Sequence, residues 1–510
     1  MNINPREDMN LRAERAILVA VRLPEGRAAA PVDYQDPLAE LRALADSAGV
    51  RTIGELIQNR EKPRGKTYLG KGKVDELAAL VKELEATLVV FDNELSPNQI
   101  QELEKELTAQ KAAAKIIDRS ELILDIFAHR ATTRQAQLQV EIAQLEYTAP
   151  RLRAMWSHLG QVTGGAPVGV GTRGPGEQQI EIDRRLVQKR LLRLQSELAE
   201  VQARKTREVQ ERRDQHFTAG LVGYTNAGKS SLFNALTAGG AFANDQLFAT
   251  LLTRVERWNL GKAREGGEVD GEQDGKLAGG ANMALLSDTV GFIRDLPHHL
   301  VASFRSTLED AIYSHVLLIV LDVADPQAPK QLAVVRQVLD EIGATQQPRI
   351  LLLNKSDKLR AMPPEEQESM RTIEEWLAQE DEAMVVSAAT GEGLEELRQR
   401  VLAIMLGELK VCELRLPIGQ GKAIDFIEKR LDVLERSYDE DAVVFQARLG
   451  RRQAEQIAAA PGLRINGLVP SAAIRELFEP KADRPARRVP PHERFAGEMP
   501  ELPAGLGEDA

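Results

Sequence analysis

The segment Gly223–Ser230, which reads Gly-Tyr-Thr-Asn-Ala-Gly-Lys-Ser, is the strongest constraint on how this chain can fold. An apolar run at residues 219–222 predicts a strand before it, and Ser231–Ala238 predicts the opening of a helix after it. The two glycines permit a tight path in which successive backbone N–H groups point at phosphate oxygens. In such a phosphate-binding loop, or P-loop, Lys229 is expected on the β- and γ-phosphates and the Ser230 hydroxyl on Mg²⁺. Considered alone, the segment could also be a chance glycine-rich turn.

Three later loops, each preceded by an apolar run, decide between these alternatives. Asp288–Gly291 can hold Mg²⁺ through water with its carboxylate, while its glycine amide meets the γ-phosphate. Asn354–Asp357 ends in a carboxylate that can accept two hydrogen bonds which guanine offers and adenine does not. Ser387–Ala389 would present a backbone amide to the guanine oxygen. Each loop alone could be an ordinary turn, but all four in this order predict a doubly wound guanine-nucleotide-binding domain.

The residues predicted to contact the nucleotide come from these four loops and from one further segment. In the four loops they are Gly223, Tyr224, Thr225, Asn226, Ala227, Gly228, Lys229, Ser230, Ser231, Asp288, Thr289, Val290, Gly291, Asn354, Lys355, Ser356, Asp357, Ser387, Ala388 and Ala389. The further segment is the candidate switch I, formed by Phe248, Ala249, Thr250, Leu251 and Leu252, with Thr253 as the alternative to Thr250. We assign Lys229, Thr250 and Gly291 to catalysis, and Ser230, Thr250 and, through water, Asp288 to the metal.

The residue after Gly291 bears on the rate of hydrolysis. Many GTPases carry at this position a glutamine that orients the attacking water, whereas this chain has Phe292. A phenyl ring cannot donate to or accept from water, so we expect slow hydrolysis by the protein alone and acceleration by a partner. The alternative is that Phe292 packs in the core and another residue orients the water.

Composition is that of an ordinary folded protein. The chain has 510 residues, enough for three or four domains, with 43% hydrophobic and 28% charged residues. It has no apolar run as long as the roughly 20 residues of a membrane span. The single cysteine, Cys412, suggests a reducing cytoplasm, and we expect it to be a small buried hydrophobe. A net charge of −11 argues against indiscriminate nucleic-acid binding.

Charge is nevertheless uneven along the chain. Residues 130–213 contain 15 Arg and Lys against 9 Asp and Glu, which makes this stretch the best candidate surface for an RNA partner. A solvated helix face of mixed charge is the alternative. A second basic segment, Lys66–Lys73, contains three glycine-flanked or neighbouring lysines that could bind a phosphate, although it lacks the spacing of a P-loop and could equally be a basic surface loop.

Before the P-loop, strands alternate with helices, which predicts a parallel α/β domain. A helix is expected to start at Asp36-Pro37 and stop at Gly49, and another to start at the capping box of Ser96. A long helix is expected from Leu122 to Tyr147. After a glycine-rich loop, a second long helix has an apolar stripe at Val187, Leu191, Leu194, Leu198 and Val201, which predicts packing between antiparallel helices.

These patterns divide the chain into five parts. They are an N-terminal α/β domain at residues 1–120, a helical hairpin at 121–215 with its loop at 160–176, a GTPase domain at 216–408 with a flexible insertion at 261–280, a small α/β module at 409–478, and a disordered tail at 479–510. Within the small module, we expect strands at residues 411–416 and 442–447 around a helix near residues 424–434.

At this point several motifs together resemble the HflX family of ribosome-associated GTPases. They are Gly70–Lys73, Phe91–Pro97, Arg173–Glu177, the P-loop and Asp288–Pro297, and the resemblance covers roughly residues 12–410. It implies a cytoplasmic protein, with a ribosome- or membrane-associated fraction, that binds the large ribosomal subunit and its rRNA and splits or rescues stalled ribosomes. It also implies that the hairpin loop reaches toward the peptidyl-transferase region. We expect a monomer that uses GTP and Mg²⁺.

The chain departs from the family pattern in places. Leu252 and Val255 stand where the family usually has an aspartate and further threonines, which puts the ordering of switch I in doubt. Residues 261–280 look like an insertion, and Gln178 and Ile180 modestly alter the element after the glycine-rich loop. Two alternative functions stay open: a GTP-dependent binding module for another RNA or protein, and an ATP-dependent RNA remodeller that works through the N-terminal domain.

Overall fold

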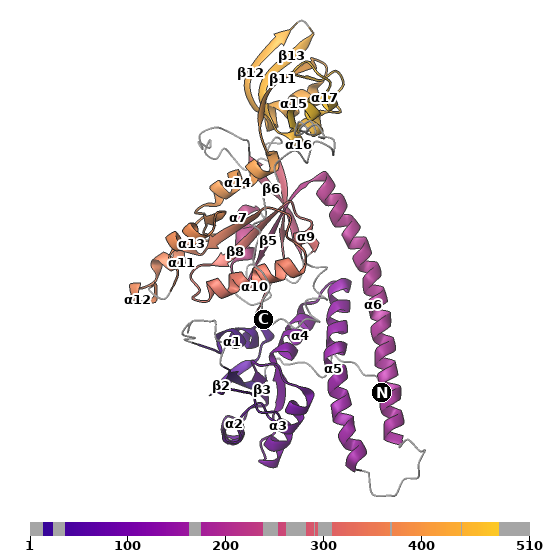
Figure 1. The fold of residues 1–510 in the computed structure, drawn as a ribbon, viewed down its shortest axis with the longest axis vertical. Helices are drawn as coiled ribbons and strands as arrows, with labels where there is room; N and C mark the ends of the chain where they lie inside the picture. The colour runs from indigo at the N-terminus through magenta and orange to yellow at the C-terminus, as the bar shows by residue number, and fades with distance from the viewer. Residues whose placement is uncertain are drawn as a thin grey trace, which may run out of the picture. The chain divides into compact units, whose positions relative to one another are not determined.

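The computed structural model describes residues 14–23, 36–162, 175–237, 253–261, 282–289, 291–293, 309–367, 370–439 and 441–478, without the side chains of 149–184. These residues belong to two compact units, which divide within a helix between Val401 and Leu402. The first unit contains a parallel sheet, a helical hairpin and a mostly parallel sheet, and the second contains an antiparallel sheet (Figure 1). The multidomain α/β fold with a P-loop domain is therefore as predicted.

The N-terminal domain is a four-stranded parallel sheet covered by helices on both faces. Its strands are β1 (Arg15–Arg22), β2 (Arg51–Asn59), β3 (Leu88–Phe91) and β4 (Lys115–Asp118), in the order β2-β1-β3-β4. Its helices are α1 (Ala39–Ala48), α2 (Lys71–Glu83), α3 (Pro97–Ala109) and α4 (Arg119–Arg130). Alternate residues of β1 enter the two cores, with Leu18 on the side of α1 and α4, and Ile17 on the side of α2 and α3.

Local signals set most of these helix ends. Ser96 and Gln99 form the predicted capping box at the start of α3, and Gly49 ends α1 with a left-handed φ of 76°. The predicted start of α1 is wrong, because the Asp36 carboxylate accepts from the backbone N–H of Leu38 and holds a turn, and the helix begins at Ala39. Strand β2 was not predicted from the sequence.

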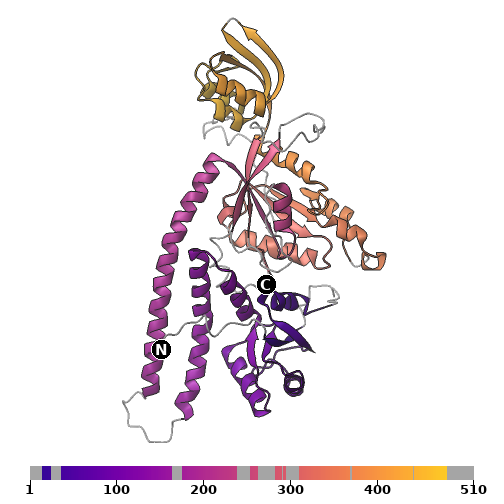
Figure 2. The same cartoon turned by 180° about the vertical axis from the view of Figure 1, so that it is seen from behind.

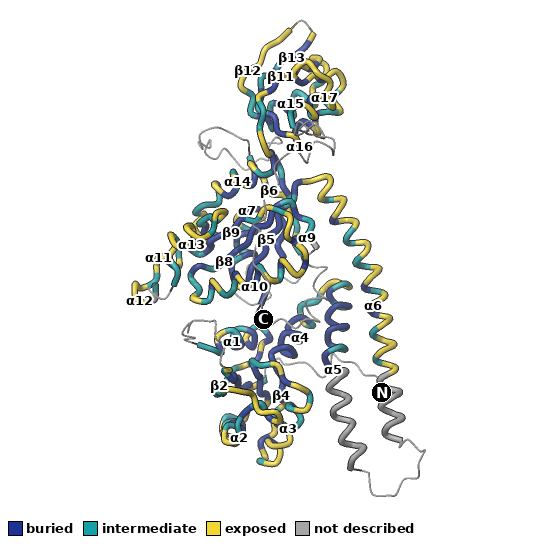
Figure 3. Tube along the Cα trace, viewed as in Figure 1, coloured by how far each residue is buried: buried dark blue, intermediate teal, exposed yellow. Residues whose placement is uncertain are grey.

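The helical hairpin consists of α5 (Arg134–Val162) and α6 (Pro175–Gln215), which run side by side in both views (Figure 1 and Figure 2). Four residues of the predicted stripe are confirmed: Leu194 and Leu198 of α6 are buried against α5, and Leu191 and Val201 are partly buried in the same cluster, of which Val187 is not a member. Much of the described part of α6 is otherwise exposed, whereas strands β5 (Phe217–Gly223) and β8 (Val316–Asp322) of the next domain are almost entirely buried (Figure 3).

Two predicted boundaries of the hairpin are wrong. The helix expected at 122–147 is broken between α4 and α5, where Ala131 is extended and the Thr133 hydroxyl accepts from the N–H of Ala136 as a new helix begins. The loop expected at 160–176 is helical at both ends, since α5 reaches Val162 and α6 begins at Pro175, a residue well suited to a first helical turn.

The third part of the first unit is a six-stranded sheet in the order β10-β9-β8-β5-β7-β6, in which β6 alone is antiparallel to its neighbour. Its strands are β5 (Phe217–Gly223), β6 (Arg254–Gly261), β7 (Asn282–Asp288), β8 (Val316–Asp322), β9 (Arg349–Asn354) and β10 (Ala383–Val385). Its helices are α7 (Lys229–Leu236), α9 (Glu309–Ile312), α10 (Ala328–Glu341), α11 (Ser356–Ala361), α12 (Pro364–Gln367), α13 (Ile373–Gln379) and α14 (Leu394–Leu406). The predicted insertion between β6 and β7 lies outside the described residues.

The second unit has a four-stranded antiparallel sheet in the order β12-β13-β11-β14. Its elements are β11 (Lys410–Pro417), α15 (Gly421–Arg430), β12 (Asp432–Asp439), β13 (Ala442–Leu449), α16 (Arg451–Ile457), β14 (Arg464–Ile465) and α17 (Pro470–Phe478). The helix expected to reach Leu434 ends at Arg430, because the following residues pair with β13 as β12. Cys412 is buried as predicted, and burial raises the pKa of its thiol. The predicted tail lies outside the described residues.

Candidate nucleotide-binding site

The P-loop connects β5 to α7, as the sequence predicts. Three residues of the loop have positive φ, namely Gly223 (157°), Asn226 (61°) and Gly228 (91°). A Cβ atom on Gly228 would lie 2.3 Å from the side-chain nitrogen of Asn354, so both the backbone angle and the packing require glycine here. Lys229 begins α7, and the first-turn amides of a helix have no partner within the helix. The loop is therefore shaped to receive an anion.

The Lys229 ammonium lies folded over this loop. Only 7% of the residue is exposed, and Nζ donates to the carbonyl oxygens of Gly223 at 3.2 Å and Tyr224 at 2.7 Å. An ammonium has three donors, so these two bonds fix its position without using its full capacity. Burial lowers the pKa of Lys229 to about 8, and the nearby Lys355 acts in the same direction against the opposing charge of Asp288.

We expect GTP binding to take up protons around that pKa. Phosphate charge favours the ammonium form, so bound nucleotide raises the pKa of Lys229, and affinity falls as the pH rises through about 8. Calorimetry of GTP binding in two buffers of different ionisation heat measures the uptake. Lys229→Gln, which has no ammonium, is expected to bind more weakly and without this uptake. A wild-type affinity that does not vary with pH in this range would contradict the prediction.

Hard oxygen ligands meet next to the lysine. The Ser230 hydroxyl donates to Oδ2 of Asp288 at 2.8 Å, and only 1% of Asp288 is exposed at the end of β7. Next to it, the Thr289 hydroxyl donates to the carbonyl oxygen of Leu221 at 2.7 Å and anchors β7 to β5. A hydroxyl and a carboxylate beside a phosphate site are the ligand types that Mg²⁺ prefers, so these residues fit the ion.

The segment predicted as switch II, which starts at Asp288–Gly291, pairs with the P-loop through the backbone of the next residue, Phe292. The Phe292 N–H donates to the carbonyl oxygen of Gly223 at 3.0 Å, and the Thr225 N–H donates to the carbonyl oxygen of Phe292 at 2.7 Å. Phe292 is only 5% exposed and belongs to the hydrophobic cluster that contains Tyr224. Its side chain therefore packs in the core, as one part of the alternative expects, while the expectation that another residue orients the water stays a prediction. Gly291 lies so close that a Cβ there would be 2.9 Å from Nζ of Lys229.

Asn354 ties the base-recognition loops to the P-loop. Its Nδ2 donates to the carbonyl oxygen of Ala227 at 2.8 Å, and its Oδ1 accepts from the N–H of Ala388 at 3.1 Å. The Ser387 hydroxyl donates to Oδ1 of Asp357 at 2.7 Å, which orients the carboxylate predicted to read guanine. Three loops that are far apart in sequence therefore form one connected surface.

Lys355 makes a second connection between these loops. Its φ is 62°, and its Nζ donates to the carbonyl oxygen of Asn226 at 2.8 Å and pairs with Asp322 at 2.6 Å. Two residues of this surface, Asp322 and Glu392, were not predicted. Glu392 accepts from the Ser356 hydroxyl at 3.0 Å. The position of Asp322 at the carboxyl end of the apolar run 316–321 could have indicated it.

The structure brings together the four predicted loops, of which all predicted residues but one are described. Val290 and the candidate switch I, Phe248–Leu252, lie outside the described residues, so their roles stay predictions. Thr253, the alternative to Thr250, immediately precedes β6.

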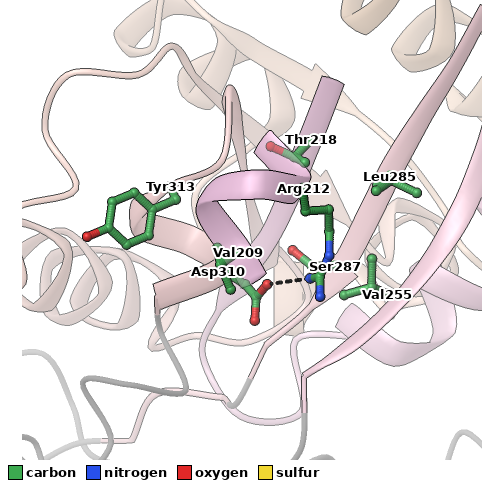
Figure 4. Close-up of a pocket in the computed structure, with 8 residues that line it drawn as sticks. All are labelled: Val209, Arg212, Thr218, Val255, Leu285, Ser287, Asp310 and Tyr313. Atoms are coloured by element: carbon green, nitrogen blue, oxygen red, sulfur yellow. Dashed lines mark hydrogen bonds and ion pairs between the residues drawn. The ribbon is translucent and has the colours of Figure 1, made fainter. Parts of the chain in front are cut away.

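A small cavity at the root of α6 is separate from this surface. Arg212 of α6 and Asp310 of α9 form an ion pair of 3.0 Å at its edge (Figure 4). The cavity measures about 10 Å³, which is at the lower limit for a single water molecule. The cavity has no room for a nucleotide. It lies where the hairpin joins the sheet that carries the P-loop.

The sheet order, the P-loop and the three loops tied to it define a P-loop GTPase. Models of the families described as GTP-binding GTPase N-terminal, GTP-binding GTPase middle region, 50S ribosome-binding GTPase and HflX C-terminal domain match residues 35–128, 130–213, 218–355 and 372–464. The chain belongs to the HflX family of GTPases, and it binds and hydrolyses GTP.

Relatives of known name agree along most of the chain. A GTPase HflX of Lacrimispora saccharolytica is 39% identical and is matched over 85% of this chain and 93% of its own length. The GTPase HflX of Escherichia coli is 38% identical and is matched over 80% of this chain and 87% of its own length. The crystal structure of a GTP-binding protein from Sulfolobus solfataricus in complex with GDP has 22% sequence identity with this chain; the match covers 77% of this chain and 98% of that one, with a TM-score of 0.38. Across the part of the chain that the structure describes, no helix is both long and apolar enough to span a membrane.

Proposed function

We propose that this GTPase binds the large ribosomal subunit in its GTP form, that the ribosome stimulates hydrolysis, and that this cycle splits or rescues stalled ribosomes in the cytoplasm. The proposal rests on one observation, that the GTPase domain and the helical hairpin lie in the same compact unit. A GTPase domain that matches a 50S ribosome-binding family follows directly on a long helical hairpin whose second helix, α6, is largely exposed in its described part. The described side chains of α6 after position 184 include nine Arg and Lys against five Asp and Glu. Such an excess favours a phosphate-backbone partner.

In this proposal each loop has one task in nucleotide binding. The P-loop amides and Lys229 hold the phosphates, and the Asp357 carboxylate, oriented by Ser387, accepts from guanine. Ser230, Asp288 through water, and Thr250 would hold Mg²⁺, which neutralises phosphate charge when it is bound. The Gly291 amide contacts the γ-phosphate. Because Phe292 packs in the core, none of its side-chain atoms orients water, and we propose that contact with the ribosome supplies the missing positioning.

Sedimentation with purified ribosomal subunits tests the partner directly. We expect co-migration with the large subunit in a non-hydrolysable GTP analogue and little in GDP. Equal co-migration in both nucleotides, or binding to another RNA in preference to the large subunit, would favour the alternative of a general GTP-dependent binding module. ATP hydrolysis that persists in Lys229→Ala would instead support a motor in the N-terminal domain.

Charge reversal on α6 tests whether the hairpin makes the contact. Arg185 and Lys189 are exposed on α6, so the double change to glutamate is expected to weaken large-subunit binding by about tenfold or more at low salt, with a smaller salt dependence. Lys82 and Lys105, exposed on α2 and α3, provide a matched control when both are changed to glutamate. Basal GTP hydrolysis of the free protein is the check on folding. Equal losses in both pairs would show a response to net charge alone.

A further inference from the structure

Tyr224, the second residue of the P-loop, is attached to three different parts of the protein. Its carbonyl oxygen accepts from Nζ of Lys229 at 2.7 Å. Its backbone runs beside Phe292, where two hydrogen bonds join switch II to the P-loop. Its hydroxyl donates to Oε1 of Glu40 at 2.7 Å, and Glu40 lies in the first turn of α1 in the N-terminal domain. One residue therefore joins the phosphate-binding lysine and switch II to a separate domain.

Glu40 is itself held by buried charge. It pairs with Nη2 of Arg119 at 2.8 Å, and Nη1 of Arg119 pairs with Asp92 at 2.7 Å. The side chain of Arg119 is 3% exposed, against 21% for Glu40 and 13% for Asp92. A buried guanidinium that is paired with two carboxylates has little freedom to move. The ion pair with Arg119 thus holds the Glu40 carboxylate in place for its hydrogen bond with Tyr224.

These charges occupy the edge at which parallel sheets bind their ligands. Asp92 directly follows β3, and Arg119 directly follows β4, so both lie at the carboxyl ends of strands. The strand order β2-β1-β3-β4 reverses direction between β1 and β3, and open α/β sheets bind ligands beside such a reversal. In this chain, the hydroxyl of the P-loop residue Tyr224 binds at that edge through Glu40.

We propose that Glu40 is a positioning residue for nucleotide binding. Backed by Arg119 and Asp92, it fixes Tyr224, and through the Tyr224 backbone it holds Lys229 and the start of switch II in the arrangement that receives phosphate. The N-terminal domain thereby sets the affinity of the GTPase domain for nucleotide. By thermodynamic linkage, bound nucleotide tightens the contact between Tyr224 and Glu40 by the same factor.

The test compares nucleotide affinity among four variants of the full chain and one control variant. Tyr224→Phe and Glu40→Ala each remove one end of the contact, and each is expected to weaken binding of a fluorescent GDP by about tenfold. The double variant is expected to be no weaker than the single ones, because both remove the same contact. Glu40→Gln keeps an oxygen that can accept from Tyr224 and is expected to retain most of the affinity. Asp46→Ala, an exposed change on the same helix, is the matched control.

A purely structural role would give a different pattern. For Glu40→Ala, we expect KM for GTP to rise and kcat to fall, and the fold-change in KM to be about ten times the fold-change in kcat. The reason is that the change acts on phosphate binding. Thermal melting of each variant without nucleotide separates loss of folding from loss of affinity. If Glu40→Ala does not fold, the nucleotide affinity of Tyr224→Phe still tests the proposal. Wild-type affinity in folded Tyr224→Phe or Glu40→Ala, or fully additive losses in the double variant, would overturn the proposal. The measurements use no ribosome, so they are independent of the proposed partner.

Discussion

Asp357→Asn is expected to change the preferred nucleotide from guanosine to xanthosine triphosphate. A carboxylate accepts from both N1–H and the exocyclic amine of guanine, whereas the amide offers one donor and one acceptor. Xanthine carries an oxygen where guanine carries that amine, so the amide suits xanthine. Sites that hydrogen-bond a base edge discriminate by roughly 10⁴-fold when a buried group is left unpaired, and we expect a shift in relative affinity of about this order.

Competition between the two nucleotides for the same protein measures the shift. Ser387→Ala is the informative control, because it removes the hydroxyl that orients the Asp357 carboxylate at 2.7 Å without changing the base-reading group. This control should weaken GTP modestly and leave the preference for guanine intact. If Asp357→Asn binds GTP as tightly as the wild type does, Asp357 does not read the base.

Gly228→Ala is expected to lower nucleotide affinity by more than about 100-fold, comparable to losing a preorganised phosphate site. The new Cβ would lie 2.3 Å from Nδ2 of Asn354, and the φ of 91° is unfavourable for any side chain. Because Asn354 also bonds Ala227 and Ala388, moving it disturbs the phosphate loop and the base loops together.

Gly343→Ala separates steric clash from backbone strain. Gly343 has a similar φ of 80°, but a Cβ there would meet nothing within 4 Å. We expect this control to lower the free energy of unfolding by about 1 kcal/mol while leaving nucleotide binding unchanged. Equilibrium dialysis for affinity and denaturant unfolding for stability distinguish the two effects. Equal affinity losses in both variants would mean that a general loss of stability, and not the contact with Asn354, lowers the affinity.

Much of the site was predictable because its signals are local. The P-loop needs glycine at fixed positions between a strand and a helix, and the base-reading carboxylate must follow an apolar strand. The capping box at Ser96 and the stripe of Leu194 and Leu198 are equally local, since they depend on spacings of three and four residues along one helix.

Other features could not be predicted from local pattern. The break between α4 and α5 interrupts a continuous helical periodicity, and the short hydroxyl cap of Thr133 was too weak a signal to place it. The first residues of β12, at positions 432–434, were predicted to be helical; they form a strand because they pair with β13, a partner further along the chain that local pattern does not reveal. Phe292 showed that glutamine is missing, but not that the ring packs in the core.

The sequence by itself determined the class of nucleotide and the family and predicted the residues of the four loops, because each is a short pattern whose chemistry depends on neighbouring residues. Only the tertiary structure decided how those loops are joined. Asn354 bonds residues 127 and 34 positions away, and Tyr224 reaches Glu40 across 184 positions. Hydrogen bonds of this kind depend on where folded elements meet in space, which spacing along the chain does not specify.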